Sequence, residues 1–245
     1  MSGNVKYSFE RCEKKCFLTP LQQEFLLCRM SRHMSADRYG KYKICNIYYD
    51  TDDWRLIRAS IEKPVYKEKL RVRSYGVPDE GGSVFVELKK KYDGVVYKRR
   101  ITAEPETAAR FLRGLIPGAR FGQIGREIEW FCEFNRPVPK VFIGYERTAF
   151  AGIEEPELRV TFDTDLRWRG SELDLRSGDY GELIIPQDKI LMEIKMPGAC
   201  PLWLSEALAK ARVYPTSFSK HGTCYREHIL KQNVEEIKKE AHFCA

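Results

Sequence analysis

The stretch Lys69-Leu70-Arg71-Val72-Arg73 decides the fold, because apolar and cationic residues alternate along it. Successive side chains of a β-strand point to opposite faces of the sheet. The three cations therefore share one face, and the other face carries only leucine and valine. The stretch predicts a strand with one apolar and one strongly basic face.

The same alternation recurs along most of the chain. In Val84–Lys91, the side chains of Glu87, Lys89 and Lys91 share the face opposite Val84, Val86 and Leu88. Similar rows occur in Arg11–Cys16, Phe142–Arg147, Leu158–Asp163 and Met192–Lys195, and in Val96, Lys98 and Arg100 after the predicted turn at Asp93-Gly94. Any one of these rows is typical of an antiparallel sheet with one solvated face.

Cations dominate these rows together, with only Glu13, Glu87, Asp163 and Glu193 to balance them. A solvated face normally mixes its charges, because like charges directly opposite each other destabilise a sheet. We therefore predict an α+β fold: a closed antiparallel β-barrel with a basic interior and with helices packed against its apolar outside. Such an interior needs an anionic ligand.

Capping residues followed by apolar periodicity predict the helices. They are expected at residues 20–32, 104–115, 125–134, 202–213 and 225–241. The chain has 245 residues and shows neither an internal repeat nor a linker, so one domain over residues 1–245 is expected.

The bulk composition points to an anionic partner. The 42 Lys and Arg residues exceed the 35 Asp and Glu residues, giving a formal net charge of +7. The sequence contains no run of about 18 apolar residues that would cross a membrane, and its start lacks a signal-peptide core, so a cytoplasmic protein is expected. The eight cysteines are scattered, which predicts reduced structural thiols.

The ligand chemistry follows from the mixture of cations. Arginine offers a planar fork for phosphate oxygens and lysine a movable point charge, which suits a chain of phosphates. Glu193, with Glu13 or Glu87, is a candidate ligand for Mn²⁺ or Mg²⁺, since these ions take a few carboxylates together with phosphate oxygens. The alternative for each acid is an ion pair with a neighbouring cation. The four histidines, with no metal-binding spacing, are expected at the surface or in helix contacts; they are His33, His221, His228 and His242.

Nine motifs, in order, resemble those of the VTC domain, the polyphosphate polymerase domain of vacuolar transporter chaperone complexes, within the triphosphate tunnel metalloenzyme superfamily. They are RCEKKC (Arg11–Cys16), NIYYDT (Asn46–Thr51), KLRVRSYG (Lys69–Gly76), VFVELKKK (Val84–Lys91), YKRR (Tyr97–Arg100), YERTAF (Tyr145–Phe150), LRVTFDTDLR (Leu158–Arg167), LMEIKM (Leu191–Met196) and SFSKHG (Ser217–Gly222).

The resemblance implies an ATP:polyphosphate phosphotransferase that uses Mn²⁺ or Mg²⁺ and releases ADP. The catalytic residues it implies are Arg71, Arg73, Arg147, Arg159 and Glu193, with Glu193 as the metal ligand. The substrate-binding residues it implies are Lys15, Lys89, Lys98, Tyr145, Ser219 and Lys220.

One departure keeps other functions open. Triphosphatase relatives open with an ExExK strand, whereas this chain has Arg11 in place of the first acid, which weakens the case for two-metal hydrolysis. A tunnel triphosphatase and a non-catalytic polyphosphate-binding module remain alternatives. Nucleic-acid binding is disfavoured, because the cations fall in strand rows without interleaved stacking aromatics. The sequence does not indicate a membrane-protein partner.

Overall fold

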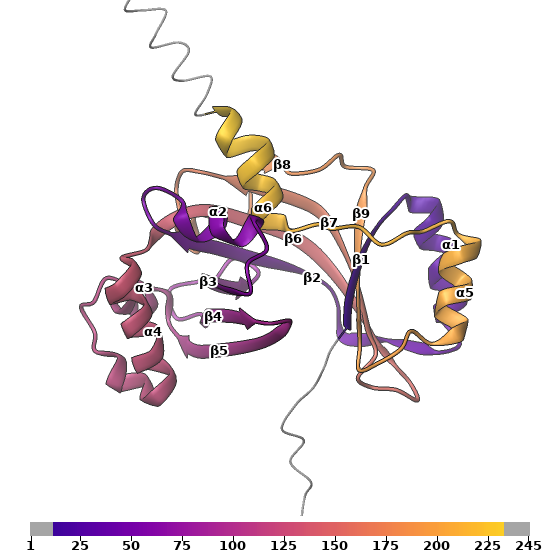
Figure 1. Ribbon diagram of the computed structural model, residues 1–245, viewed down its shortest axis with the longest axis horizontal. Coiled ribbons are helices and arrows are strands. Elements are labelled where there is room, and N and C mark those ends of the chain that lie inside the picture. The colour runs from indigo at the N-terminus through magenta and orange to yellow at the C-terminus, as the bar shows by residue number, and fades with distance from the viewer. Residues whose placement is uncertain (1–11, 233–245) are drawn as a thin grey trace, which may run out of the picture. The chain divides into compact units, whose positions relative to one another are not determined.

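The computed structural model describes residues 12–232, and the fold is given for that part of the chain (Figure 1). Its strands are β1 (Cys12–Leu18), β2 (Met34–Asp50), β3 (Tyr66–Tyr75), β4 (Val84–Tyr92), β5 (Val95–Ala103), β6 (Val138–Gly152), β7 (Arg159–Arg169), β8 (Glu182–Leu183) and β9 (Ile190–Met196). Its helices are α1 (Pro20–Met30), α2 (Arg55–Ile61), α3 (Pro105–Leu112), α4 (Gly122–Asn135), α5 (Leu202–Lys210) and α6 (Lys220–Cys224). Two 3₁₀ turns, η1 (Gly118–Phe121) and η2 (Leu175–Ser177), and a π-helical segment, η3 (Tyr225–Ile229), complete the described elements. Arg11, His242, Cys244 and the end of the predicted helix 225–241 lie outside the described residues.

Four predicted helices appear close to their expected bounds, as α1, α3, α4 and α5. α1 begins at Pro20 because Thr19 caps it in a capping box. The Thr19 hydroxyl accepts a hydrogen bond from the Gln22 amide at 3.3 Å, and the Gln22 side chain accepts one from the Thr19 amide at 2.9 Å. The sequence pattern does not predict the short helices α2 and α6.

The strands form one sheet in the order β1-β9-β7-β6-β2-β3-β4-β5, with β8 paired to β7. The α+β antiparallel prediction is therefore confirmed. Within residues 12–232, the hydrogen-bonded order ends at β1 and at β5, and no pairing joins these two strands. The sheet is thus not closed by hydrogen bonds, and the closed barrel stays a prediction.

The chain folds into two compact units, and β2, β6 and β7 contribute residues to both. The first unit takes in residues 12–42, 146–165 and 185–218 of the described chain. Its core packs α1 and α5, which lie side by side in Figure 1, against the apolar faces of strands β1, β7 and β9. Leu26, Met192 and Leu204 are each fully buried there.

The second unit takes in residues 43–145, 166–184 and 219–232. Here α3 and α4 pack on the apolar face of β3, β4 and β5, with Phe111 and Phe131 against Leu70, Val86 and Leu88. The alternation predicted for these strands is confirmed, because every second residue enters this core. The cations between them point to the opposite face.

No helix within residues 12–232 has the length and apolar character that crossing a membrane requires. The cysteines in the same part of the chain are all free.

Candidate functional site

Glu87 is the centre of the basic face of the second unit. Its carboxylate is 1% exposed and lies against three cations: Arg71 Nε at 2.9 Å, Lys98 Nζ at 2.7 Å and Arg100 Nε at 2.7 Å. Burial alone would raise the pKa of Glu87, but the charges of Arg71, Arg73 and Lys98 outweigh it and hold that pKa well below its ordinary value. The sequence leaves two roles open for Glu87, as a metal ligand or as a partner of neighbouring cations. The structure shows it paired with cations.

A row of lysines crosses the same face. Lys69 on β3 lies opposite Lys89 on β4, which lies opposite Lys98 on β5. Like charges in directly opposed positions destabilise a sheet, so this row favours a bound anion. Lys69 Nζ also lies 3.5 Å from the hydroxyl of Ser219, which brings another predicted substrate contact to the row.

A second group of predicted residues surrounds Arg73, which is 8% exposed. Its Nε donates to Asn46 Oδ1 at 2.9 Å, and its Nη2 donates to the Tyr145 hydroxyl at 3.2 Å. The ammonium of Lys220 lies 4.4 Å from the centre of the Tyr145 ring. The predictions for Arg73, Tyr145 and Lys220 therefore describe side chains that the fold brings together.

Tyr48 and His221 were not predicted as site residues, yet they belong to this group. Arg71 Nη1 donates to the Tyr48 hydroxyl at 3.1 Å, and the His221 ring stacks on Tyr48 at 4.4 Å. Burial would raise the pKa of Tyr48, but the charges of Arg71 and Arg73 lower it to about 8. Tyr48 shares a strand face with Asn46 in the NIYYDT motif, and His221 follows Lys220 in SFSKHG, so the position of both was readable from the motifs.

His221 is 4% exposed, and neither ring nitrogen has a hydrogen-bond partner within residues 12–232. Burial, followed by the charge of Lys69, lowers its pKa well below the ordinary value of 6.5. His221 belongs to helix α6, and its ring stacks on Tyr48 of strand β2.

Lowering the pH should therefore reduce the free energy of unfolding, because His221 is buried in its neutral form. The unfolded chain takes up a proton below about pH 6.5 and the folded chain does not, so stability falls by up to about 1.4 kcal/mol per pH unit as pH decreases toward the folded pKa. Denaturant unfolding at pH 7 and pH 5 measures the slope. His221→Gln should flatten it, whereas His33→Gln, which removes an exposed histidine, serves as the control. An unchanged slope in His221→Gln would contradict the assignment.

In the first unit, Glu193 lies at the centre of a row across three strands. Lys15 on β1 and Thr161 on β7 are its opposed partners. The side chain of Glu193 is 10% exposed, and its Oε1 lies 2.8 Å from Lys195 Nζ. Lys15 Nζ pairs with Glu13 at 3.2 Å and donates to the Phe218 carbonyl at 3.1 Å.

Glu193 is the metal ligand that the sequence predicts. Among residues 12–232, no three His, Cys, Asp or Glu side chains gather into a site. The hydroxyl of Thr161, opposite Glu193, is buried without a hydrogen-bond partner in the described structure. One carboxylate and one orphaned oxygen fit Mg²⁺ or Mn²⁺, which commonly bind through one or two carboxylates plus phosphate oxygens.

The two remaining predicted arginines differ in their surroundings. Arg147 forms a two-pronged ion pair with Asp163, which is fully buried, at 2.6 and 2.7 Å. Arg159 is exposed and lies opposite Lys195. Arg147 is therefore anchored by a carboxylate that the sequence analysis did not pair with it.

Comparison with known proteins identifies the family. The model of the VTC domain matches residues 10–229. The chain belongs to the VTC domain family. Subunit 4 of the vacuolar transporter chaperone complex of Schizosaccharomyces pombe is 22% identical over 195 residues, which is 67% of this chain but 27% of that protein. This VTC domain chain thus spans about a quarter of that relative's length.

Two solved structures share the fold of this VTC domain. A proposed adenylyl cyclase of Hippeastrum, reported with a dominant triphosphatase activity, has a TM-score of 0.52 and 16% identity, covering 88% of this chain and 94% of its own. A proposed adenylate cyclase of Bacillus halodurans has a TM-score of 0.51 and 13% identity, covering 84% and 92%. At these identities the likeness describes the fold alone.

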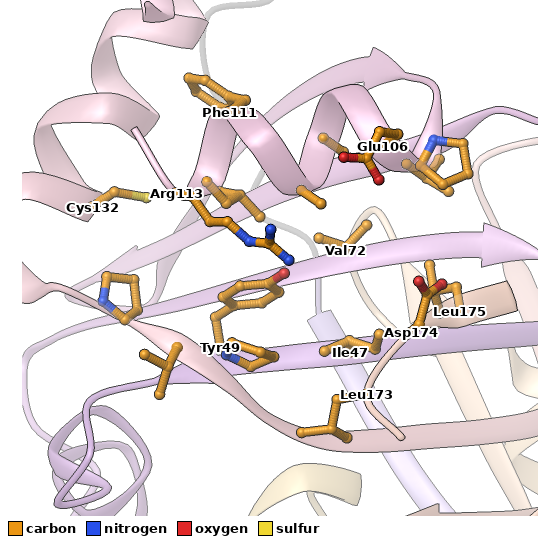
Figure 2. Close-up of a pocket in the computed structure, with 18 of the residues that line it drawn as sticks. Ile47, Tyr49, Val72, Glu106, Phe111, Arg113, Cys132, Leu173, Asp174 and Leu175 are labelled. Carbon is orange, nitrogen blue, oxygen red and sulfur yellow. The ribbon is translucent and has the colours of Figure 1, made fainter. Parts of the chain in front are cut away.

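The VTC domain also contains a cavity of about 650 Å³ beneath α3 and α4, on the apolar face of the second unit. Figure 2 shows the Arg113 side chain reaching toward the hydroxyl of Tyr49, above Ile47. Burial raises the pKa of Tyr49 to about 12. None of the predicted site residues lines this cavity. Arg71 and Arg73, for example, alternate with its lining residue Val72 along β3 and so lie on the opposite face.

Proposed function

We propose that this chain is a metal-dependent polyphosphate polymerase that transfers the terminal phosphoryl group of ATP to a growing polyphosphate chain and releases ADP. Membership of the VTC domain family supports the link to polyphosphate. The observation that carries the proposal is the basic face of the second unit, where rows of arginine and lysine surround the buried carboxylate of Glu87. The proposal includes the predicted closed barrel with its basic interior.

Phosphoryl transfer needs in-line positioning and neutralisation of charge more than covalent chemistry. The bond between the β,γ-bridging oxygen and the γ-phosphorus of ATP breaks, and a bond forms between that phosphorus and a terminal oxygen of the acceptor chain. The bridging electrons leave with ADP. Arg71, Arg73, Arg147 and Arg159 are proposed to neutralise the nucleotide phosphates.

The remaining cations are proposed to hold the acceptor and product. Lysine suits this role because an ammonium tolerates many phosphate geometries. The residues assigned to it are Lys15, Lys89, Lys98 and Lys220, with hydroxyl contacts from Tyr145 and Ser219. A Mn²⁺ or Mg²⁺ ion held by Glu193 would add positive charge at the phosphate oxygens.

A tunnel triphosphatase is the second candidate, because the similar Hippeastrum structure is reported with that activity. The two reactions differ only in the acceptor, which is water in one case and a phosphate chain in the other.

The deciding experiment incubates the pure protein with ATP and Mn²⁺ and follows ADP, free phosphate and polymer on a gel. ADP with a ladder of long chains supports the polymerase. Free phosphate without a ladder would replace it with the triphosphatase. A protein that makes neither product but melts at a higher temperature with polyphosphate would be a binding module.

Charge reversal at Arg73 should weaken binding of inorganic triphosphate by about 100-fold, because the side chain is buried among the site residues. Arg73→Gln, which keeps amide donors, should lose about tenfold. Calorimetric titration measures both. Arg99→Glu, the same change on the α4-facing side of β5, is the control. Wild-type affinity in both Arg73 variants would mean that this arginine does not face the phosphates.

A further inference from the structure

β3 and β4 carry one more pair of cations beyond the lysine row. Lys67 and Lys91 lie directly opposite each other, two residues along their strands from Lys69 and Lys89. Residues two apart share a face, so this pair continues the basic face of the second unit. Both side chains are half-buried.

In the described part of the chain, neither lysine of this pair forms an ion pair with a carboxylate. Within residues 12–232, Lys67 Nζ donates only to the Ser60 carbonyl, at 3.3 Å, and Lys91 has no ion pair. The adjacent Lys90, on the opposite face, pairs with Glu68 at 3.7 Å. Two opposed, half-buried cations without an acid destabilise the sheet unless an anion joins them.

The electrostatics agree with the geometry. Burial, followed by the charges of Lys91, Lys63 and Lys89, lowers the pKa of Lys67. A bound anion would relieve this repulsion and restore the ordinary pKa. The pair therefore has the features of a site that is completed by its ligand.

The distance between Arg73 and Lys67 along β3 indicates how long a phosphate chain must be to reach the Lys67–Lys91 pair. Lys67 lies six positions before Arg73 on β3, which is about 20 Å of extended strand. A triphosphate has only two phosphate–phosphate links, so one held at Arg71 and Arg73 ends before Lys67. A longer phosphate chain continues past the Lys69 row.

We propose that Lys67 and Lys91 form a further phosphate subsite, which binds an extended polyphosphate chain beyond its first three phosphates. The inference rests on the proposed function, since it takes Arg71 and Arg73 to hold the first phosphates. The order of residue types along the face supports it. Arginine forks, which fix phosphate orientation, lie at one end, and lysines, which allow a chain to slide, lie at the other.

The test compares inorganic triphosphate with long-chain polyphosphate as ligands for the whole chain. The double variant Lys67→Ala/Lys91→Ala should bind the long chain about tenfold more weakly and triphosphate with unchanged affinity. Lys90→Ala is the matched control for the single variant Lys91→Ala: a neighbour on the same strand, with the same charge change, on the opposite face. Circular dichroism and melting temperatures verify folding.

Three results would overturn the subsite: an unchanged affinity of the double variant for the long chain, an equal loss for triphosphate, or an equal loss of long-chain affinity in Lys90→Ala and Lys91→Ala. An equal loss in Lys90→Ala and Lys91→Ala would mean that the long chain responds to surface charge in general and not to a specific subsite. If the wild-type protein binds neither ligand, the proposed function itself is wrong. Failure of the subsite and failure of the proposed function therefore give different results.

Discussion

Glu193→Gln should reduce turnover of ATP by at least about 100-fold while the affinity for inorganic triphosphate stays within about twofold of wild type. The amide keeps the size of the carboxylate but loses its charge, and a neutral oxygen binds Mn²⁺ or Mg²⁺ weakly. The phosphates would still be held by the arginines and lysines. Steady-state ADP release measures turnover, and calorimetric titration measures binding of triphosphate and of Mn²⁺ separately.

The control for this change is Glu155→Gln, which removes an exposed acid from the same unit. It should leave turnover and Mn²⁺ binding at wild-type values. If Glu193→Gln keeps its activity and its Mn²⁺ affinity, the metal assignment is wrong and the ion pair with Lys195 becomes the whole role of this residue.

Glu87→Gln should lower the melting temperature by about 10 °C, corresponding to about 3–5 kcal/mol of stability. The glutamate is 1% exposed and neutralises Arg71, Lys98 and Arg100. Removing its charge leaves these cations next to each other without compensation. Added inorganic triphosphate should raise the melting temperature of the variant more than that of wild type, because the anion supplies the missing charge.

Glu68→Gln is the matched control for Glu87→Gln. Glu68 is also a shielded acid, on the neighbouring strand β3, but it faces away from the basic rows and pairs with Lys90. Its loss should cost much less than that of Glu87. Equal destabilisation by the two changes would show that Glu87 is an ordinary ion-pair partner and not the centre of the basic face.

Much of the fold was predictable because alternation is a local property. In Lys69–Arg73, backbone geometry alone sends the cations to one face and Leu70 and Val72 to the other, whatever the rest of the chain does. Thr19 and Pro20 likewise fix the start of α1 from neighbouring residues. The open ends of the described sheet at β1 and β5 carry no comparable local signal.

The sequence predicted which residue types form the site, but not which side chains contact one another. Glu87 and Glu193 look alike in the sequence, each sharing a strand face with lysine. Register places Glu87 between two arginines, and it places Glu193 opposite Lys15 and Thr161. Glu87 is thereby paired with three cations, whereas Glu193 pairs with Lys195 and lies beside the buried hydroxyl of Thr161.

The pairing of Arg147 with Asp163 and the burial of His221 against Tyr48 have the same origin. Each joins segments that are far apart in the chain, or adjacent only through the sheet. The sequence by itself determined the two-faced strands, the surplus of cations and the resemblance to the VTC domain family. Only the tertiary structure decided which charges neutralise one another, because side-chain direction depends on the local backbone, whereas ion pairing and burial depend on the register of distant strands.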